Sequence, residues 1–113
     1  MSYEPLSVLR MLSAQSEADQ LRELLHDVID PELGVNIVDL GLVYGVEVDG
    51  RAVDVLITTT TPACPLGEYI TDEVRRVLLD SGAVDDVRVE ITHTPPWEPE
   101  MVSAAIKEEF GWA

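Results

Sequence analysis

The chain has 113 residues, which fits a single domain large enough to bury its own core, and 46% of them are hydrophobic, as in a folded globule. Its 22 acidic and 7 basic residues give a formal net charge of −15, which argues against nucleic acid and anionic membranes as partners and favours basic protein surfaces. No apolar run approaches the roughly 20 residues that span a bilayer, and the acidic start lacks the pattern of a secretory signal, so we expect a cytoplasmic protein.

The first predicted element is a helix that begins after an N-terminal extension. We assign residues 1–15 to the extension and residues 16–113 to the domain. Ser16 is the expected N-cap, and apolar residues then recur at the spacing of one helical face to about Val28. Asp30-Pro31 ends the helix, because the residue before a proline avoids the helical region. A loop that contains Gly34, Asn36 and Gly41 is expected to follow.

Two strands joined by a tight turn are predicted next. Asp49-Gly50-Arg51 is a hairpin signal between two stretches of alternating residues. In the first strand, one face is expected to carry Leu42, Tyr44, Val46 and Val48. In the second strand, one face is expected to carry Val53, Val55, Ile57 and Thr59. The β-branched residues of the second strand are typical of a central position in a sheet.

The second half of the chain predicts a helix, a strand and a final helix. Helical spacing runs from Leu66 to a C-cap at Gly82, and alternation returns over residues 87–91. A stiff loop follows, and Pro99 suits the first position of a last helix that ends at Gly111. The strand–helix–strand unit of residues 52–92 should form a right-handed crossover with a parallel strand pair. The order helix–strand–strand–helix–strand–helix therefore predicts a small single domain of the α/β (α+β) class, with a three-stranded mixed sheet covered by helices.

Cys64 is the residue that most strongly indicates chemistry. As the only cysteine, it cannot form an intramolecular disulfide or complete a structural zinc site. It lies in the loop Thr61–Pro65, just before a predicted helix, where free N–H groups and the helix dipole stabilise an anion. We therefore expect its thiol pKa to fall below roughly 8.5, which favours metal binding or nucleophilic attack. The alternative is a buried cysteine that acts as a small hydrophobic residue.

Histidine and carboxylate side chains could complete a site around Cys64. Cys64 and His93 both follow strands that are predicted to be parallel, and the carboxyl ends of such strands share one edge of the sheet. The loop before the hairpin adds Asp30, Glu32 and Asp39 as candidate metal ligands or as hydrogen-bond acceptors near the site. The alternatives are that these carboxylates cap turns and that His93 is merely hydrogen-bonded or exposed.

Four blocks of the sequence resemble, in order and spacing, the SufT/PaaD-type family of iron–sulfur cluster assembly factors. This family includes the eukaryotic cytosolic iron–sulfur targeting factor. The resemblance covers about residues 17–112. The blocks are Asp30-Pro31-Glu32, Asp39-Leu40-Gly41-Leu42-Val43-Tyr44, Thr61-Pro62-Ala63-Cys64-Pro65 and Pro96-Trp97-Glu98-Pro99.

The resemblance implies a non-enzymatic role in the maturation of iron–sulfur proteins, with scaffold and client proteins as partners. It implies that Cys64 is the functional residue and that the site of a transient iron–sulfur cluster is lined by Thr61, Asp39, Asp30 and Glu32. Glu32 and His93 are candidate secondary metal ligands beside Asp39. Because one thiolate per chain cannot hold a cluster, we also expect that the chain can form a homodimer.

Two alternatives to a cluster carrier remain open at this point. The first is an adaptor that holds no metal and serves iron–sulfur targeting or the maturation of an oxygenase of the phenylacetate-degradation type. The second is a thiol enzyme in which Cys64 is the nucleophile and His93 the base.

Overall fold

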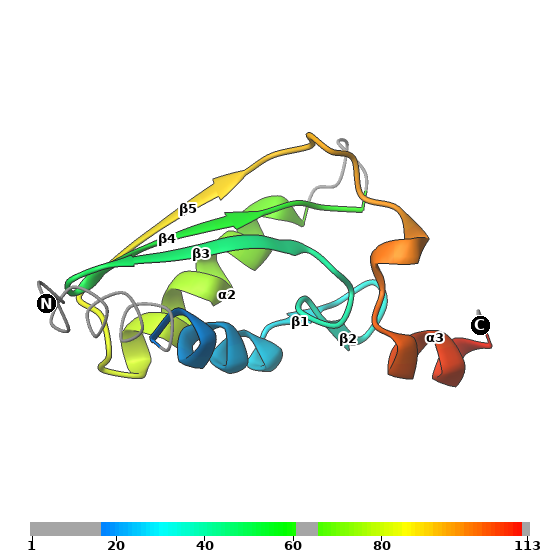
Figure 1. Cartoon of the computed structure of the whole chain (residues 1–113), viewed down its shortest axis with the longest axis horizontal. Coiled ribbons are helices and arrows are strands. Elements are labelled where there is room, and N and C mark those ends of the chain that lie inside the picture. The colour runs from blue at the N-terminus through cyan, green and yellow to red at the C-terminus, as the bar shows by residue number, and fades with distance from the viewer. Residues whose placement is uncertain (1–16, 61–65, 112–113) are drawn as a thin grey trace, which may run out of the picture.

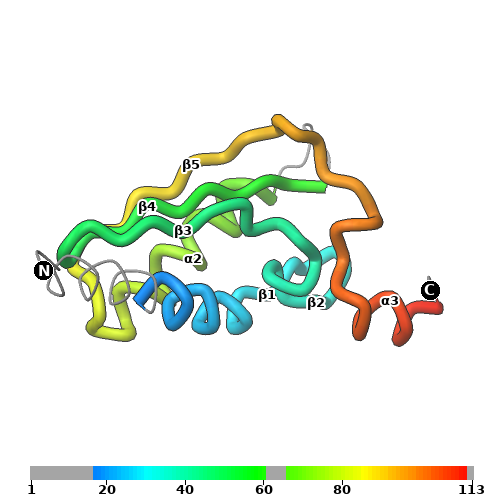
Figure 2. Tube along the Cα trace, in the orientation of Figure 1, coloured from blue at the N-terminus to red at the C-terminus, as the bar shows by residue number. Residues whose placement is uncertain are grey.

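The computed structural model describes residues 17–60 and 66–111, and a three-stranded mixed sheet dominates it (Figure 1). β3 (Val43–Asp49) pairs antiparallel with β4 (Ala52–Ile57), which pairs parallel with β5 (Asp86–Ile91). The helix α2 (Gly67–Asp80) joins β4 to β5 and packs against the sheet, a crossover that can be followed in Figure 2. The predicted fold class, hairpin and parallel pair are confirmed. The extension, residues 1–15, lies outside the described residues.

The core lies between one face of the sheet and the helices. Apolar residues gather on one face of the sheet because strands alternate with a period of 2, and on one face of each helix because helices repeat every 3.6 residues. These apolar faces pack together in the core. Its fully buried members include Leu25, Leu42, Val53, Ile57, Ile70, Val74 and Leu78. In the described part of the chain, helices cover this face of the sheet and leave the other face uncovered (Figure 1). The sheet was predicted to be covered by helices, and this holds for one face. Among the described helices, none has the length and apolar composition of a membrane span.

The segment before the sheet differs from the prediction. Residues 17–24 are helical, but the α-helix gives way to a 3-10 turn, η1 (Leu25–Asp27), and does not continue to Val28. Where a loop was expected, β1 (Ile29–Asp30) and β2 (Val35–Asn36) form a small antiparallel ribbon. The buried carboxylate of Asp30 accepts hydrogen bonds from the backbone N–H groups of Glu32 and Leu33, at 2.8 and 3.3 Å. These bonds close the turn that the ribbon needs.

The predicted face of Tyr44 is wrong because β3 contains a β-bulge. The pairing with β4 moves from Val43↔Ile57 to Gly45↔Leu56, so Tyr44 is an extra residue without a partner in the register. The bulge reverses the alternation of faces before Val46. Tyr44 therefore lies on the face away from α2, where its hydroxyl donates a hydrogen bond to the carbonyl oxygen of Pro95, at 2.8 Å.

The predicted last helix is divided into two. Pro99 begins a 3-10 turn, η2 (Pro99–Met101), and α3 (Ala104–Phe110) starts separately. Ser103 breaks the run because its side chain caps α3 by accepting a hydrogen bond from the N–H of Ile106. The predicted stop is confirmed, since Gly111 ends α3 in the left-handed conformation with φ of 74°.

Residues 95–103, which we call the strap, are bound to the loop before β3. The indole N–H of Trp97 donates to the carbonyl oxygen of Leu40 at 2.6 Å, and the N–H of Ser103 donates to that of Asp39 at 2.7 Å. Gly41 lies directly beneath the strap with φ of 77°, and a Cβ atom on it would come within 2.8 Å of the Cβ of Met101. The close approach and the positive φ both require glycine.

We expect Gly41→Ala to lower the free energy of unfolding by about 2–4 kcal/mol, because alanine would be strained at this φ and would collide with Met101. Urea unfolding followed by circular dichroism measures this loss. Gly34→Ala is the matched control, since Gly34 has φ of 69° but no atoms within 4 Å of the added Cβ. The control should lose only about 1–2 kcal/mol. Equal losses in the two variants would contradict close packing of the strap on Gly41.

Candidate functional site

The carboxyl ends of β4 and β5 lie side by side and carry polar residues. The N–H of Thr92, the residue after β5, donates to the carbonyl oxygen of Ile57, the last residue of β4, at 2.9 Å and so extends the parallel ladder by one bond. Beyond it, the hydroxyl of Thr59 and Nε2 of His93 lie 3.0 Å apart in a hydrogen bond. Thr59 is only 4% exposed and His93 is half-buried. The histidine is therefore held at the strand ends by a buried neighbour.

The first turn of α2 packs against the same ends of β4 and β5. Gly67 is buried, and a Cβ atom on it would lie 3.1 Å from Cδ1 of Ile91 and 3.9 Å from Cγ2 of Thr59. A glycine at this position lets the helix start approach the sheet closely. The helix thus begins at the edge that carries His93 and runs back along the sheet, and β5 then returns the chain to that edge.

Thr61 and Cys64 lie outside the described residues. In the chain they fall between Thr60, which follows β4, and Leu66, which precedes α2. Their predicted roles stay predictions.

Asp39 lies in a polar group that sequence reasoning did not identify. One carboxylate oxygen accepts a hydrogen bond from the side-chain amide of Asn36 at 2.8 Å, and the side-chain oxygen of Asn36 accepts from the N–H of Asp39 at 2.9 Å. The other carboxylate oxygen lies 4.0 Å from Nε2 of His26. The ribbon of β1 and β2 separates His26 from Asp39 in the chain, and no spacing rule brings such residues together. Of these residues, only Asn36 could have been recognised from the sequence, because asparagine side chains often form hydrogen bonds with nearby backbone groups in turns.

The remaining predicted carboxylates have separate positions. Asp30 closes its own turn, as the alternative interpretation proposed, and Glu32 is exposed in that turn. Within residues 17–60 and 66–111, no three His, Cys, Asp or Glu side chains are grouped so that they could hold a metal ion. The roles of Glu32, Asp39 and His93 as secondary metal ligands therefore stay predictions that involve Cys64.

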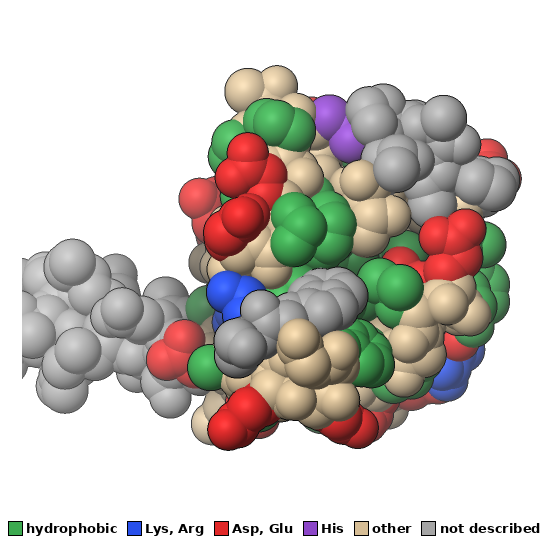
Figure 3. Space-filling model, turned by 90° about the vertical axis from the view of Figure 1, so that its right-hand side faces the viewer, with side chains coloured by type: hydrophobic (Ala, Val, Ile, Leu, Met, Phe, Trp, Pro, Cys, Tyr) green, Lys and Arg blue, Asp and Glu red, His purple; other side chains and the backbone are tan. Residues whose placement is uncertain are grey.

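The end of the molecule toward which β4 and β5 run exposes many acidic side chains, with apolar side chains between them (Figure 3). The described cations are already engaged: Arg22 donates to the carbonyl oxygen of Val43, and Lys107 donates to that of Glu100. Arg51 forms a close pair with Asp85 at 2.6 Å, and its hydrogen bonds lower the pKa of the Asp85 carboxyl. The surface therefore presents mainly unneutralised carboxylates to a partner.

Comparison with known proteins relates most of the chain to iron–sulfur cluster assembly. Residues 18–91 match the family described as "Iron-sulfur cluster assembly protein". The chain is 46% identical over 85 residues to the Fe-S protein maturation auxiliary factor SufT of Staphylococcus aureus, a match that covers 74% of this chain and 97% of that protein. It is 42% identical over 72 residues, 64% of its length, to an iron-sulfur cluster carrier protein of Deinococcus radiodurans, but covers only 21% of that protein.

A solved structure shows the same fold. The crystal structure of a domain of unknown function, DUF59, from Bacillus anthracis superposes with a TM-score of 0.86 at 35% identity. The superposition covers 91% of this chain and 99% of the other. The shared architecture thus extends over nearly the whole of both chains.

Thr59→Val should lower the free energy of unfolding by about 1 kcal/mol, because valine preserves the shape and strand preference of threonine but cannot bond His93. The imidazole resonances of His93 should shift in the same variant, as measured by NMR. Thr60→Val, at the neighbouring half-buried position, is the control and should leave those resonances in place. If the two variants moved the resonances equally, the pairing of Thr59 with His93 would be wrong.

Proposed function

Since the chain belongs to the iron–sulfur cluster assembly protein family, we propose that it acts as a maturation factor that receives an iron–sulfur cluster and passes it to client proteins. The family match extends from the first helix to the end of β5 and so includes Cys64 and the two elements that precede and follow it in the chain, β4 and α2. Membership in the family, which the four sequence blocks predicted, is confirmed. The role proposed here is non-catalytic and cytoplasmic, as the sequence indicated.

In this proposal Cys64 is the ligand that binds the cluster. Thiolates are the usual ligands of iron–sulfur clusters, and this is the only thiol in the chain. The observation that supports the assignment most directly is the edge formed by Thr59, His93 and the start of α2, where Gly67 is buried. Cys64 stands two positions before Leu66, which precedes this turn, and a thiolate near a helix start is stabilised by its N–H groups.

The other predicted residues would have supporting roles. Nε2 of His93 is engaged by Thr59, so a bond from His93 to iron would fall to Nδ1. Asp39 would have to leave Asn36 to bind a metal with that oxygen, which makes it a weaker ligand than Cys64. We assign Thr61 to the orientation of the Cys64 loop and Glu32 to an exposed, secondary position.

Partners must supply the remaining ligands of a cluster. One thiolate per chain is insufficient, so the cluster is shared either between two copies of this chain or with a scaffold or client protein. The charge of −15 favours scaffold and client surfaces that are basic and makes their attraction sensitive to salt.

Anaerobic reconstitution with iron and sulfide should give the native protein visible absorbance and bound iron. Cys64→Ser should lose both and keep the fold, while Asp39→Ala should bind less tightly but measurably, because a carboxylate is a secondary ligand. Glu108→Ala, at an exposed position on α3, is the matched control and should bind as the native protein does.

Activation of an apo iron–sulfur enzyme by the same variants separates the alternatives. Loss of activation in Cys64→Ser, without any iron uptake by the native protein, would favour the adaptor without metal. A native protein in which neither iron binding nor activation depends on Cys64 would overturn the proposal. Turnover of a small electrophile that needs Cys64 and His93 would instead establish the thiol enzyme.

The reconstituted protein should sediment as a homodimer, and the protein without cluster should contain a larger share of monomer, because the shared cluster supplies the link between two thiolates. Analytical ultracentrifugation of both states makes the comparison. Cys64→Ser treated in the same way is the control and should not gain dimer. A strict monomer in every state would require that a partner protein supplies the other ligands.

A further inference from the structure

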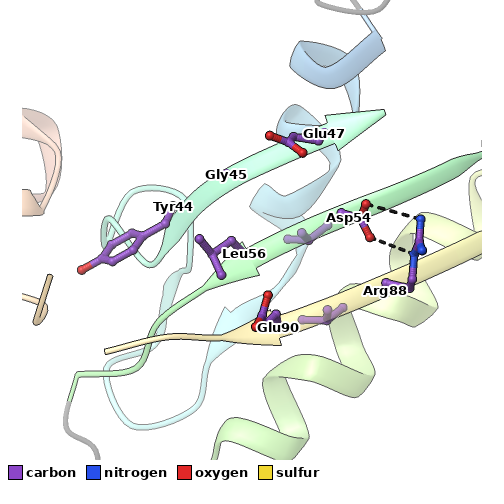
Figure 4. A pocket seen from close by; sticks show the side chains of 9 residues that line it. Tyr44, Gly45, Glu47, Asp54, Leu56, Arg88 and Glu90 are labelled. Carbon is purple, nitrogen blue, oxygen red and sulfur yellow. Dashed lines mark hydrogen bonds and ion pairs between the residues drawn. The ribbon is translucent and has the colours of Figure 1, made fainter. Parts of the chain in front are cut away.

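The face of the sheet away from α2 carries a hollow that the proposed function does not use. Its volume is about 620 Å³, and its lining includes Tyr44, Gly45, Glu47, Asp54, Leu56 and Glu90. Figure 4 looks onto this surface, which we call the open face, and shows these residues on the three strands with the helices behind. No element of the described part of the chain covers it.

A second hollow continues the first toward the strap. Tyr44 and Leu56 line both, and the second, of about 630 Å³, adds Thr94, Pro95 and Met101. It presents mainly apolar atoms, whereas the first is edged by carboxylates. The open face therefore has an apolar end and an acidic end that meet at Tyr44 and Leu56.

Gly45 leaves space in the first hollow beside Leu56, where the two hollows meet. Its backbone does not adopt a positive φ, so its conformation does not demand glycine. A Cβ atom there would meet only Cβ of Leu56, at 3.8 Å, which is an ordinary contact. Glycine inside a strand weakens the sheet and often marks either a bulge, which β3 has at this point, or a place where a ligand or another backbone approaches closely.

Tyr44 is a rigid wall of the hollow. The bulge in β3 turns it onto the open face, and its hydroxyl is bonded to the carbonyl oxygen of Pro95 at 2.8 Å and lies 3.5 Å from the sulfur of Met101. A fixed aromatic side chain contributes contact area with little loss of conformational entropy on binding.

The charge of the open face selects among occupants. Arg88 pairs with Asp54, with Nε 2.8 Å from Oδ1, and this pair is close to neutral. Glu47 and Glu90 then leave an excess of negative charge at the acidic end. A second copy of this chain would bring a like-charged face, which opposes association.

We propose that the open face docks a segment of a partner protein that carries an aliphatic or aromatic side chain beside lysine or arginine. The apolar side chain contacts Tyr44 and Leu56 where the two hollows meet, beside Gly45, and the cation meets Glu47 and Glu90. This surface is on the opposite side of the sheet from α2, so the proposal does not depend on metal binding at Cys64.

Titration with a fluorescein-labelled peptide that contains one leucine beside two lysines tests the proposal, with fluorescence anisotropy as the readout. Gly45→Val should weaken binding about ten-fold by filling the hollow, while it leaves thermal stability equal or higher because valine favours strands. Glu47→Lys should weaken it by a similar factor. Glu108→Lys, which makes the same change in net charge on α3, should have less than about a two-fold effect. Cys64→Ser should bind as the native protein does.

Three results would overturn the proposal. The first is an equal loss of affinity in Glu47→Lys and Glu108→Lys, which would mean attraction by net charge alone. The second is equal binding of a matched peptide with glutamates in place of the lysines. The third is unchanged affinity in a Gly45→Val variant that is shown to be folded. Loss of iron binding in Cys64→Ser with retained peptide binding would keep the two proposals distinct.

Discussion

The parallel pairing of β4 with β5 across α2 is the constraint on which the candidate site depends. A parallel pair brings two carboxyl ends to one edge, and the crossover helix must start where the first strand ends. Ile57 and Thr92 continue the ladder, and beyond them the hydroxyl of Thr59 meets His93. The burial of Gly67 against Ile91 then fixes the helix start at the same edge. The described residues on the two sides of the loop between β4 and α2, Thr59 and Gly67, are both buried at this edge.

Electrostatics acts over the whole surface rather than at one point. The described arginines are paired with carboxylates or with backbone carbonyl oxygens, as Arg51 is with Asp85 and Arg88 with Asp54. These interactions occupy the few cationic side chains of the described residues and leave most of the described carboxylates facing solvent. Such a field steers encounter with basic partners, and local shape then has to choose among them.

The periodic parts of the fold could be predicted from the sequence, whereas the irregular parts could not. Alternation in β4 and helical spacing in α2 follow from burial on one face, and both were predicted. Tyr44 was assigned to the wrong face because a bulge inserts one residue without any change in composition. The ribbon of β1 and β2 was missed because Asp30 closes its turn through a side-chain bond. The position of His93 at a strand end could be predicted, but its partner could not, since strand preference alone accounts for a threonine at position 59.

The hydrogen bonds that hold the strap tolerate mutation of their acceptor residues better than mutation of their side-chain donors. Trp97, Ser103 and Tyr44 are the donors, and the acceptors are the backbone carbonyl oxygens of Leu40, Asp39 and Pro95. Every residue type has such a carbonyl, so the acceptor residues can vary in evolution without loss of these bonds. The indole of Trp97 and the phenol of Tyr44 have no such substitutes. The strap can therefore stay bound when a residue that supplies only a carbonyl acceptor is replaced, provided that position 41 beneath it remains glycine.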